Sequence, residues 1–175
     1  HKWKLDAQWY LKLVGNMVLM ARVRYGFLGL YNRDLGLPPF ERFFVGGDGW
    51  QAFAFNPLGG DIIGLRGYSN NSLGPRDPST GQTLGGTIFN RISLELRQPI
   101  SLEQSATVWV QAFLEAGDSW ANFDTFSPFN LKRSVGVGVR VFLPFFGLLG
   151  VDYGYGLDPV LGPNDGLHRG RFHFM

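Results

Sequence analysis

The sequence predicts an all-β protein, a transmembrane antiparallel β-barrel, and three observations lead to this prediction. Apolar residues recur at every second position through most of the 175 residues, which is the period of a β-strand rather than of a helix. The segments with this period are about ten residues long, and a tilted strand of this length crosses the hydrocarbon core of a bilayer. The links between the segments are alternately short and long, as in barrels of the bacterial outer membrane.

The composition agrees with this fold class and excludes several others. The chain has 25 glycines, no cysteine, 45% hydrophobic residues and 17% charged residues. Glycine is about twice as frequent as usual, yet it follows no Gly-X-Y period, so collagen is excluded. The 16 basic and 14 acidic residues are too evenly balanced to predict nucleic-acid binding from net charge. No run reaches the roughly 18 apolar residues of a membrane helix, and without cysteine there is no disulfide and no thiol nucleophile.

The first two predicted strands span residues 2–14 and 16–26. In the first, tryptophan and leucine residues alternate with lysines and other polar residues. In the second, methionine, leucine and valine residues form one face, and two arginines lie on the other. A tight turn around Gly15 joins these strands, and a long link at residues 32–85 precedes the next one.

The next three predicted strands span residues 87–97, 106–117 and 133–143. The first of them sets isoleucine and leucine residues against a polar face that holds Glu95. The second sets valine, alanine and leucine residues against Glu115 and bulky aromatic residues. In the third, valines alternate with serine, glycine and arginine.

The last two predicted strands span residues 149–157 and 169–175. Valine and tyrosine alternate with glycine and aspartate in the first, and phenylalanine alternates with arginine and histidine in the second. Seven strands cannot close an outer-membrane barrel, because single-chain bacterial barrels have even strand numbers. We therefore expect further strands before His1 and a last strand that continues past Met175. On this interpretation residues 1–175 are the C-terminal half of one barrel domain, with no second domain.

A soluble β-sandwich is the alternative fold. Its strands are usually shorter, about 5–6 residues, and its polar faces contact solvent, where lysine, glutamate and threonine are expected. Here the polar faces carry repeated glycines and the bulky Trp109 and Phe113, as the crowded lumen of a barrel would. The sequence therefore favours the membrane barrel.

The long link at residues 32–85 carries the most specific pattern. Connections of more than about 15 residues without secondary structure are usually functional or disordered, and this one is neither polar nor of low complexity. Its pattern consists of Glu-Arg-Phe at 41–43, Gly-Gly at 46–47, the loop motif Gly64, Leu65, Arg66, Gly67 and Tyr68, and Gly-Pro-Arg at 74–76.

This pattern resembles the long loop of the BamA family of outer-membrane assembly factors, whose hallmark is the tetrad Val/Ile/Leu-Arg-Gly-Phe/Tyr. The resemblance continues through residues 93–96, 113–120 and 134–138, in the same order and spacing, and covers essentially the whole chain. It implies the last seven strands of a barrel of about sixteen, with the long loop folded inward. One departure is an insertion at residues 48–64, where many relatives have only a few residues, and we predict an extra extracellular hairpin there.

In the family, the arginine of the tetrad meets acidic side chains of the barrel wall inside the lumen. The resemblance implies this role for Arg66, and strand parity independently places Glu95 and Glu115 on inward faces. A guanidinium suits the role because it is always charged and its planar fork binds carboxylates. The simpler alternative is that Arg66 is a solvated loop arginine and that both glutamates are ordinary lumen charges.

The neighbours of Arg66 have expected roles of their own. Gly64 and Gly67 would allow the close backbone approach and the unusual dihedral angles that a tight loop tip needs. Tyr68 is expected to pack on inward-facing aromatic residues such as Trp109 or Phe113.

Signals for catalysis and for metal binding are poor. The three histidines form no i, i+4 pair and no cluster with carboxylates, so no metal site is predicted. Ser134 and His173 both fall on inward faces, but nothing supplies the orienting acid that nucleophilic catalysis requires. We expect no catalytic residue, no enzyme activity and no cofactor. The surplus of basic residues on inward faces suggests either an anion-selective pore or a hydrated lumen balanced by the rest of the barrel, and we favour the second.

The resemblance implies a protein that assembles and inserts β-barrel proteins into the bacterial outer membrane. In the family the barrel opens laterally between its first and last strands, and substrate strands add at that edge. The implied partners are outer-membrane lipids, nascent outer-membrane β-barrel proteins, and periplasmic and lipoprotein assembly subunits, with no nucleic acid. The alternatives are a sibling translocation and assembly factor (TamA-like), a two-partner secretion transporter and, from a different class, a passive porin.

Overall fold

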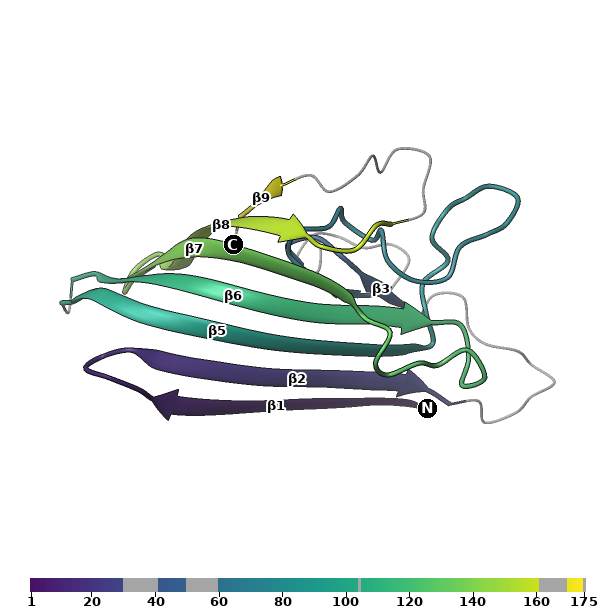
Figure 1. Cartoon of the computed structure of the whole chain (residues 1–175), viewed down its shortest axis with the longest axis horizontal. Helices are drawn as coiled ribbons and strands as arrows, with labels where there is room; N and C mark the ends of the chain where they lie inside the picture. The colour runs from purple at the N-terminus through teal and green to yellow at the C-terminus, as the bar shows by residue number, and fades with distance from the viewer. Residues whose placement is uncertain (30–40, 50–59, 104, 161–169, 175) are drawn as a thin grey trace.

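The computed structural model describes residues 1–29, 41–49, 60–103, 105–160 and 170–174. Its main element is a curved seven-stranded sheet in which each strand runs antiparallel to its neighbours, in the order β1-β2-β5-β6-β7-β8-β9 (Figure 1). These strands are β1 (Lys2–Lys12), β2 (Val18–Leu28), β5 (Ile88–Leu102), β6 (Thr107–Trp120), β7 (Lys132–Leu143), β8 (Gly147–Gly156) and β9 (Gly170–Phe174). Among the described residues, no helix is long and apolar enough to cross a membrane.

The structure confirms the all-β prediction and the seven predicted strands, although the ends of the strands differ. β1 ends at Lys12, two residues earlier than predicted, because Leu13 N donates to the carbonyl of Met17 at 2.9 Å and begins a turn. β5 continues to Leu102, beyond the predicted end at residue 97, after a register shift that begins at Pro99. Proline is tolerated within a strand at such an irregularity, because it has no N–H to donate to the ladder.

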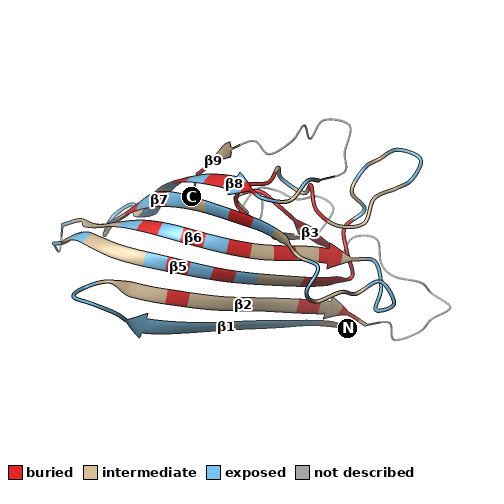
Figure 2. Cartoon of the chain, viewed as in Figure 1, coloured by how far each residue is buried: buried red, intermediate tan, exposed pale blue. Residues whose placement is uncertain are grey.

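The two faces of the sheet differ in chemistry, as a period of two predicts. Buried and exposed residues alternate along β5 to β8, whereas β1, at an edge of the sheet, is exposed along most of its length (Figure 2). The exposed face is apolar and includes Leu94, Leu114, Val137, Val151 and Tyr153. The opposite face is buried and polar and includes Glu95, Glu115, Ser134, Arg140 and Asp152. Lipid on one side and an enclosed polar lumen on the other account for this alternation.

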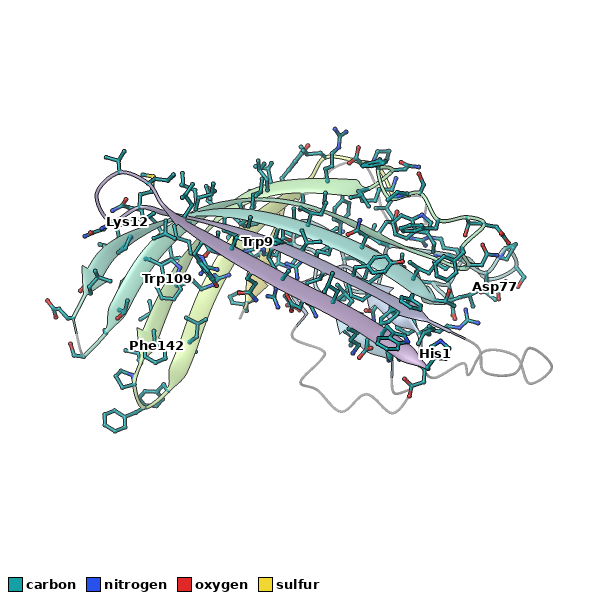
Figure 3. All side chains as sticks on the ribbon, turned by 90° about the horizontal axis from the view of Figure 1, so that it is seen from below. His1, Trp9, Lys12, Asp77, Trp109 and Phe142 are labelled. Carbon is teal, nitrogen blue, oxygen red and sulfur yellow. The ribbon has the colours of Figure 1, made fainter. Side chains whose placement is uncertain are left out.

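The links at the two ends of the sheet differ in length. Short turns join β1 to β2 and β7 to β8 at the end that holds Lys12 and Phe142, whereas the long links leave the end that holds His1 and Asp77 (Figures 1 and 3). In outer-membrane barrels, short turns face the periplasm and long loops face the outside. The end with the long links corresponds in this respect to the extracellular end of such barrels.

The long link between β2 and β5 contains two strands that the sequence did not predict. β3 (Phe43–Val45) pairs in parallel with β4 (Asp61–Ile63). The alternation of residues did not reveal these strands, because strands of three residues are too short to show a period and parallel pairing joins segments far apart in the sequence. The hairpin predicted in the 48–64 insertion involves residues 50–59, which lie outside the described residues.

The loop packs against the buried, polar face of the sheet near the end with the long links. β3 contacts β5 and β6, and the centroid of the Phe43 ring lies 4.7 Å from that of Phe89 on β5. A Cβ atom at Gly26 on β2 would come within 2.4 Å of the Phe89 ring, so glycine makes room for this contact. The buried apolar cluster consists of Leu28, Phe43, Val45, Ile63, Leu65, Tyr68, Leu73 and Phe89. This cluster, which we call the base of the loop, holds the chain on both sides of Arg66.

Candidate functional site

Arg66 lies at the tip of the loop and is buried, with 3% of its surface exposed. It binds three carboxylates from three strands, which we call the carboxylate cluster: Glu95 on β5, Glu115 on β6 and Asp152 on β8. Arg66 Nε donates to Glu115 Oε1 at 3.0 Å, and the Arg66 main-chain N–H donates to Glu115 Oε2 at 2.9 Å. Nη1 donates to Asp152 Oδ2 at 2.9 Å, and Nη2 donates to Glu95 Oε1 at 2.5 Å. The planar fork of the guanidinium thus bridges three strands, which the compact ammonium of a lysine could not do with the same geometry.

An aromatic ring covers the face of this guanidinium. Arg66 Cζ lies 3.6 Å from the centroid of the Phe113 ring on β6, and such a cation–π contact is strongest where water is excluded. Phe113 packs in turn on β7 at Gly136, where a Cβ atom would come within 2.3 Å of the ring. Carboxylates around the edge and a ring on the face together fix the orientation of Arg66.

Each carboxylate also accepts a hydrogen bond from an arginine of the wall. Arg97 binds Glu95 at 3.0 Å, Arg91 binds Glu115 at 2.6 Å and Arg140 binds Asp152 at 2.8 Å. This alternation of charge compensates each carboxylate, as burial of an ion requires. Burial alone would lower the pKa of Arg66, but the charge and hydrogen bonds of Glu115, with the charges of the other two carboxylates, raise that pKa above its ordinary value. Arg66 therefore stays charged in its buried position.

Glycines allow the loop tip to touch the backbone of the wall. Gly67 has a φ of 89°, a region that favours glycine, and a Cβ atom on it would come within 2.9 Å of the main chain of Gly156 on β8. On the facing side, a Cβ atom at Gly154 would lie 2.6 Å from Gly67 N. Within the loop, a Cβ atom at Gly64 would lie 2.9 Å from Gly49 N. These are contacts with backbone atoms, so no flexible side chain could move to accept the added carbon.

Tyr68 lies beside the tip but differs from its expected position. Phe113 covers the guanidinium, whereas Tyr68 belongs to the apolar cluster at the base of the loop. The Tyr68 hydroxyl donates to the carbonyl of Arg133 at 2.6 Å and accepts from Asp158 N at 3.3 Å. Burial raises the pKa of Tyr68 to about 12, so the hydroxyl remains a donor. The expectation of packing on Trp109 or Phe113 overlooked that Arg66 needs the same aromatic face.

A second buried contact joins the tip to β9. The Gly67 N–H donates to His173 Nε2 at 2.8 Å, and only 5% of the surface of His173 is exposed. Strand parity places His173 on the inward face, but nothing in the sequence indicates that its partner is a main-chain group of the loop.

The structure brings Arg66, Glu95 and Glu115 together, and Arg66 is buried rather than solvated. Sequence reasoning missed Asp152 as the third carboxylate. Parity places Asp152 inward together with several other charged residues, and only the position of the loop tip in space selects it. His173 was missed for the same reason.

The arrangement can hold a loop in one position inside the barrel wall. In the part of the chain that the structure describes, no group of three or more histidine, aspartate or glutamate side chains could hold a metal ion. Beside the tip, a cavity of about 730 Å³ is lined by residues that include Arg22, Arg24, Arg91, Glu95 and Trp109. The loop therefore fills part of the space along the polar face of the described sheet.

Comparison with known proteins gives a consistent family. The model of the Omp85 superfamily domain matches residues 1–175. Outer membrane protein assembly factor BamA of Nitratidesulfovibrio vulgaris is 32% identical over 180 residues, which cover 97% of this chain and 19% of that protein. BamA of Neorickettsia risticii is 30% identical over 112 residues (62% of this chain, 15% of that protein), and BamA of Neisseria meningitidis serogroup B is 28% identical over 116 residues (64% and 13%). The chain thus spans less than a fifth of the length of these relatives.

These relatives confirm the resemblance to the BamA family that the loop motif indicates, and the superfamily domain indicates the bacterial outer membrane as the location of the chain. The apolar exposed face of the sheet suits that location. Because the family model matches its whole length, the chain belongs to the Omp85 superfamily.

Proposed function

We propose that this chain is part of a protein that assembles and inserts other β-barrel proteins into the bacterial outer membrane. The names of its relatives support this activity at the level of the family. The observation that carries the proposal is the docked loop tip, in which Arg66 is buried among three carboxylates of the inner wall. A loop held this way obstructs a passive pore, whereas in an assembly factor it can hold the wall in a defined shape while substrates add elsewhere.

In this proposal the barrel opens laterally between its first and last strands, and substrate strands add to the exposed edge. An unpaired edge presents a row of N–H and C=O groups that templates a new strand. We assign β9 to one side of this seam. The assignment rests on the family resemblance and on the place of β9 at the edge of the described sheet.

We further propose that the protein acts without covalent catalysis or a cofactor. Two observations support this. The three carboxylates of the site are each hydrogen-bonded to arginines, and Nε2 of His173 already accepts from the Gly67 N–H. The proposed partners are nascent barrel proteins at the seam and outer-membrane lipids against the apolar face. Periplasmic and lipoprotein subunits are proposed from the family resemblance alone.

The experiment that tests this function uses the full-length protein reconstituted in liposomes with its assembly partners. Insertion of an unfolded β-barrel substrate is followed by its acquisition of protease resistance. We expect Arg66→Ala to reduce the insertion rate at least tenfold. Arg76→Ala is the matched control, because Arg76 lies on the same loop but donates to the carbonyls of Gly81 and Ser72 instead of to carboxylates.

Three outcomes would contradict the proposal or the part of the loop tip in it. Unchanged insertion by Arg66→Ala would show that the docked tip has no part in assembly. Swelling of liposomes in sugar solutions without any insertion of substrate would indicate a porin, and secretion of a soluble passenger without insertion would indicate a two-partner transporter.

A further inference from the structure

The contact between Gly67 and His173 connects two parts of the chain that the proposed function treats separately. Gly67 belongs to the loop tip, whereas His173 lies on β9, 106 residues further along the chain. The bond measures 2.8 Å between Gly67 N and His173 Nε2, and both groups are buried. A buried N–H that loses its acceptor is destabilising, because water cannot replace the lost bond. The position of the tip and the position of β9 are therefore energetically linked.

This bond determines the protonation state of the histidine. A main-chain N–H can only donate, so Nε2 must be the acceptor, and the ring proton must lie on Nδ1. A second proton on the ring would occupy Nε2 and turn it into a donor that faces another donor. The docked tip therefore requires the neutral imidazole with its proton on Nδ1.

The charged groups around His173 come from several elements. Asp152 is its direct partner on β8 in the strand register, and Asp152 is bound by Arg66 of the loop and by Arg140 of β7. Asp48 of the loop and Glu115 of β6 also act on the imidazole electrostatically. An imidazolium would be attracted to Asp152 and would compete there with Arg66. Protonation thus opposes docking twice, through the lost acceptor and through this competition.

We propose that neutral His173 is a positioning residue that couples the docked loop tip to β9. Docking of the tip favours the paired position of β9, and by thermodynamic reciprocity the pairing of β9 favours docking. The role of this coupling in assembly rests on the proposed function: a docked tip keeps the seam between the first and last strands closed, and an undocked tip releases it. The coupling itself does not rest on that function, because it follows from the contact of His173 with Gly67.

Three substitutions of His173 distinguish the effect of its hydrogen-bond acceptor from the effect of its side-chain size. His173→Gln places a carbonyl oxygen at about the reach of Nε2 and keeps an acceptor for Gly67. His173→Asn carries the same amide at the shorter reach of Nδ1, and His173→Phe keeps a ring without an acceptor. The coupling predicts that glutamine preserves the contact and that asparagine and phenylalanine lose it.

The test measures amide hydrogen exchange in the full-length protein in lipid nanodiscs, as protection factors corrected for the intrinsic rate. At pH 8 we expect His173→Phe and His173→Asn to lower protection about tenfold both at residues 64–68 and at residues 170–174. His173→Gln should stay within about threefold of the wild type. Strands β1 and β2 serve as the folding control and should be unchanged in all variants.

The pH dependence of the wild type supplies a second readout. Lowering the pH until the imidazole of His173 is protonated should reduce protection in both segments together, because a protonated ring cannot accept from the Gly67 N–H, while His173→Gln should show no such loss. The coupling is wrong if phenylalanine and glutamine behave alike, or if the two segments respond independently. The insertion assay on Arg66→Ala tests the proposed function separately, so failure of that assay would leave the coupling intact.

Discussion

The base and the tip of the long loop are held to the same wall by opposite kinds of contact. At the base, Phe43 and Val45 of β3 and Ile63 of β4 are buried in an apolar cluster. At the tip, Arg66 is surrounded by three carboxylates and one aromatic ring. Apolar burial is non-directional, whereas hydrogen bonds between a guanidinium and carboxylates are restricted in distance and angle. The base therefore keeps the loop inside the lumen, and the tip determines where on the wall it lies.

The comparison shows that the stability a contact contributes is not the same as the stability lost when one of its partners is removed. A buried ion pair contributes little net stability, because the loss of hydration offsets the attraction between its charges. Removal of one partner is nevertheless costly, because the remaining charge stays buried without compensation. Loss of an apolar side chain removes only its own burial and leaves a cavity. The tip should therefore be the more sensitive of the two regions, although the base contributes more.

The largest effect is expected for Arg66→Ala. It removes the shared partner of Glu95, Glu115 and Asp152, and it should weaken loop docking by about 3–5 kcal/mol. Arg66→Lys keeps the charge but loses the fork, and should show an intermediate effect. Hydrogen exchange of residues 61–68 in the full-length protein measures the docking free energy. Equal protection in the alanine variant and the wild type would contradict the proposed sensitivity of the tip.

A smaller effect is expected for Leu65→Ala at the base. Leu65 is fully buried in the apolar cluster, and its truncation should cost about 3 kcal/mol. Leu84→Ala is the matched control, because Leu84 lies on the same link but is 44% exposed. The same exchange experiment applies. A loss larger than that of Arg66→Ala would reverse the order of the two regions.

Gly154→Ala should separate the tip from the base. The added Cβ atom would lie 2.6 Å from Gly67 N, so the tip must shift, at a cost of about 1–3 kcal/mol. Protection should fall at Gly67 and persist in β3 and β4. Val151→Ala changes an outward-facing residue of the same strand and should leave both segments protected. Uniform loss along the whole loop would mean that base and tip form one cooperative unit.

The smallest effect is expected for the exposed contact between Arg133 on β7 and Asp158 on the link between β8 and β9. Hydrogen bonds from the Arg133 side chain lower the pKa of Asp158 below its ordinary value of 3.8. Because the lowered pKa belongs to the folded state, this contact stabilises fully above about pH 4 and is lost as the pH falls through the lowered pKa. Exchange of the Asp158 amide, which donates to Tyr68, should lose protection in that acidic range. Asp158→Asn should lack this step, and a step at neutral pH would contradict the assignment.

The period of two in the sequence was sufficient to predict the sheet and the inward positions of Glu95 and Glu115. Period and parity are local properties, because each strand exposes one face to lipid and the other to the lumen. The ends of β1 and β5 were less accurate, because they depend on a turn hydrogen bond and on a register shift at Pro99. Neither leaves a signal in the alternation.

The contacts of the loop could be predicted only in part. The tetrad motif identified Arg66, but parity offers several inward charges and cannot choose Asp152 among them. β3 and β4 are too short for a period, and the contacts of Tyr68 and His173 depend on where the tip lies. Such choices depend on distances between segments up to 106 residues apart, which only the folded chain brings together.

The glycines of β8 have a consequence for how the wall could be observed. Gly154 and Gly156 face the loop tip with hydrogen atoms alone, while Tyr153 and Tyr155 of the same strand point to the opposite, exposed face. At this place only the backbone of β8 separates the docked loop tip from the apolar, exposed face of the sheet. Undocking of the tip would expose the backbone of Gly154 and Gly156 to water. The rings of Tyr153 and Tyr155 would then lie on the other side of a more hydrated stretch of the wall. The fluorescence of Tyr153 and Tyr155, measured with a quencher dissolved in the bilayer, would then report whether the tip is docked, without a label inside the lumen.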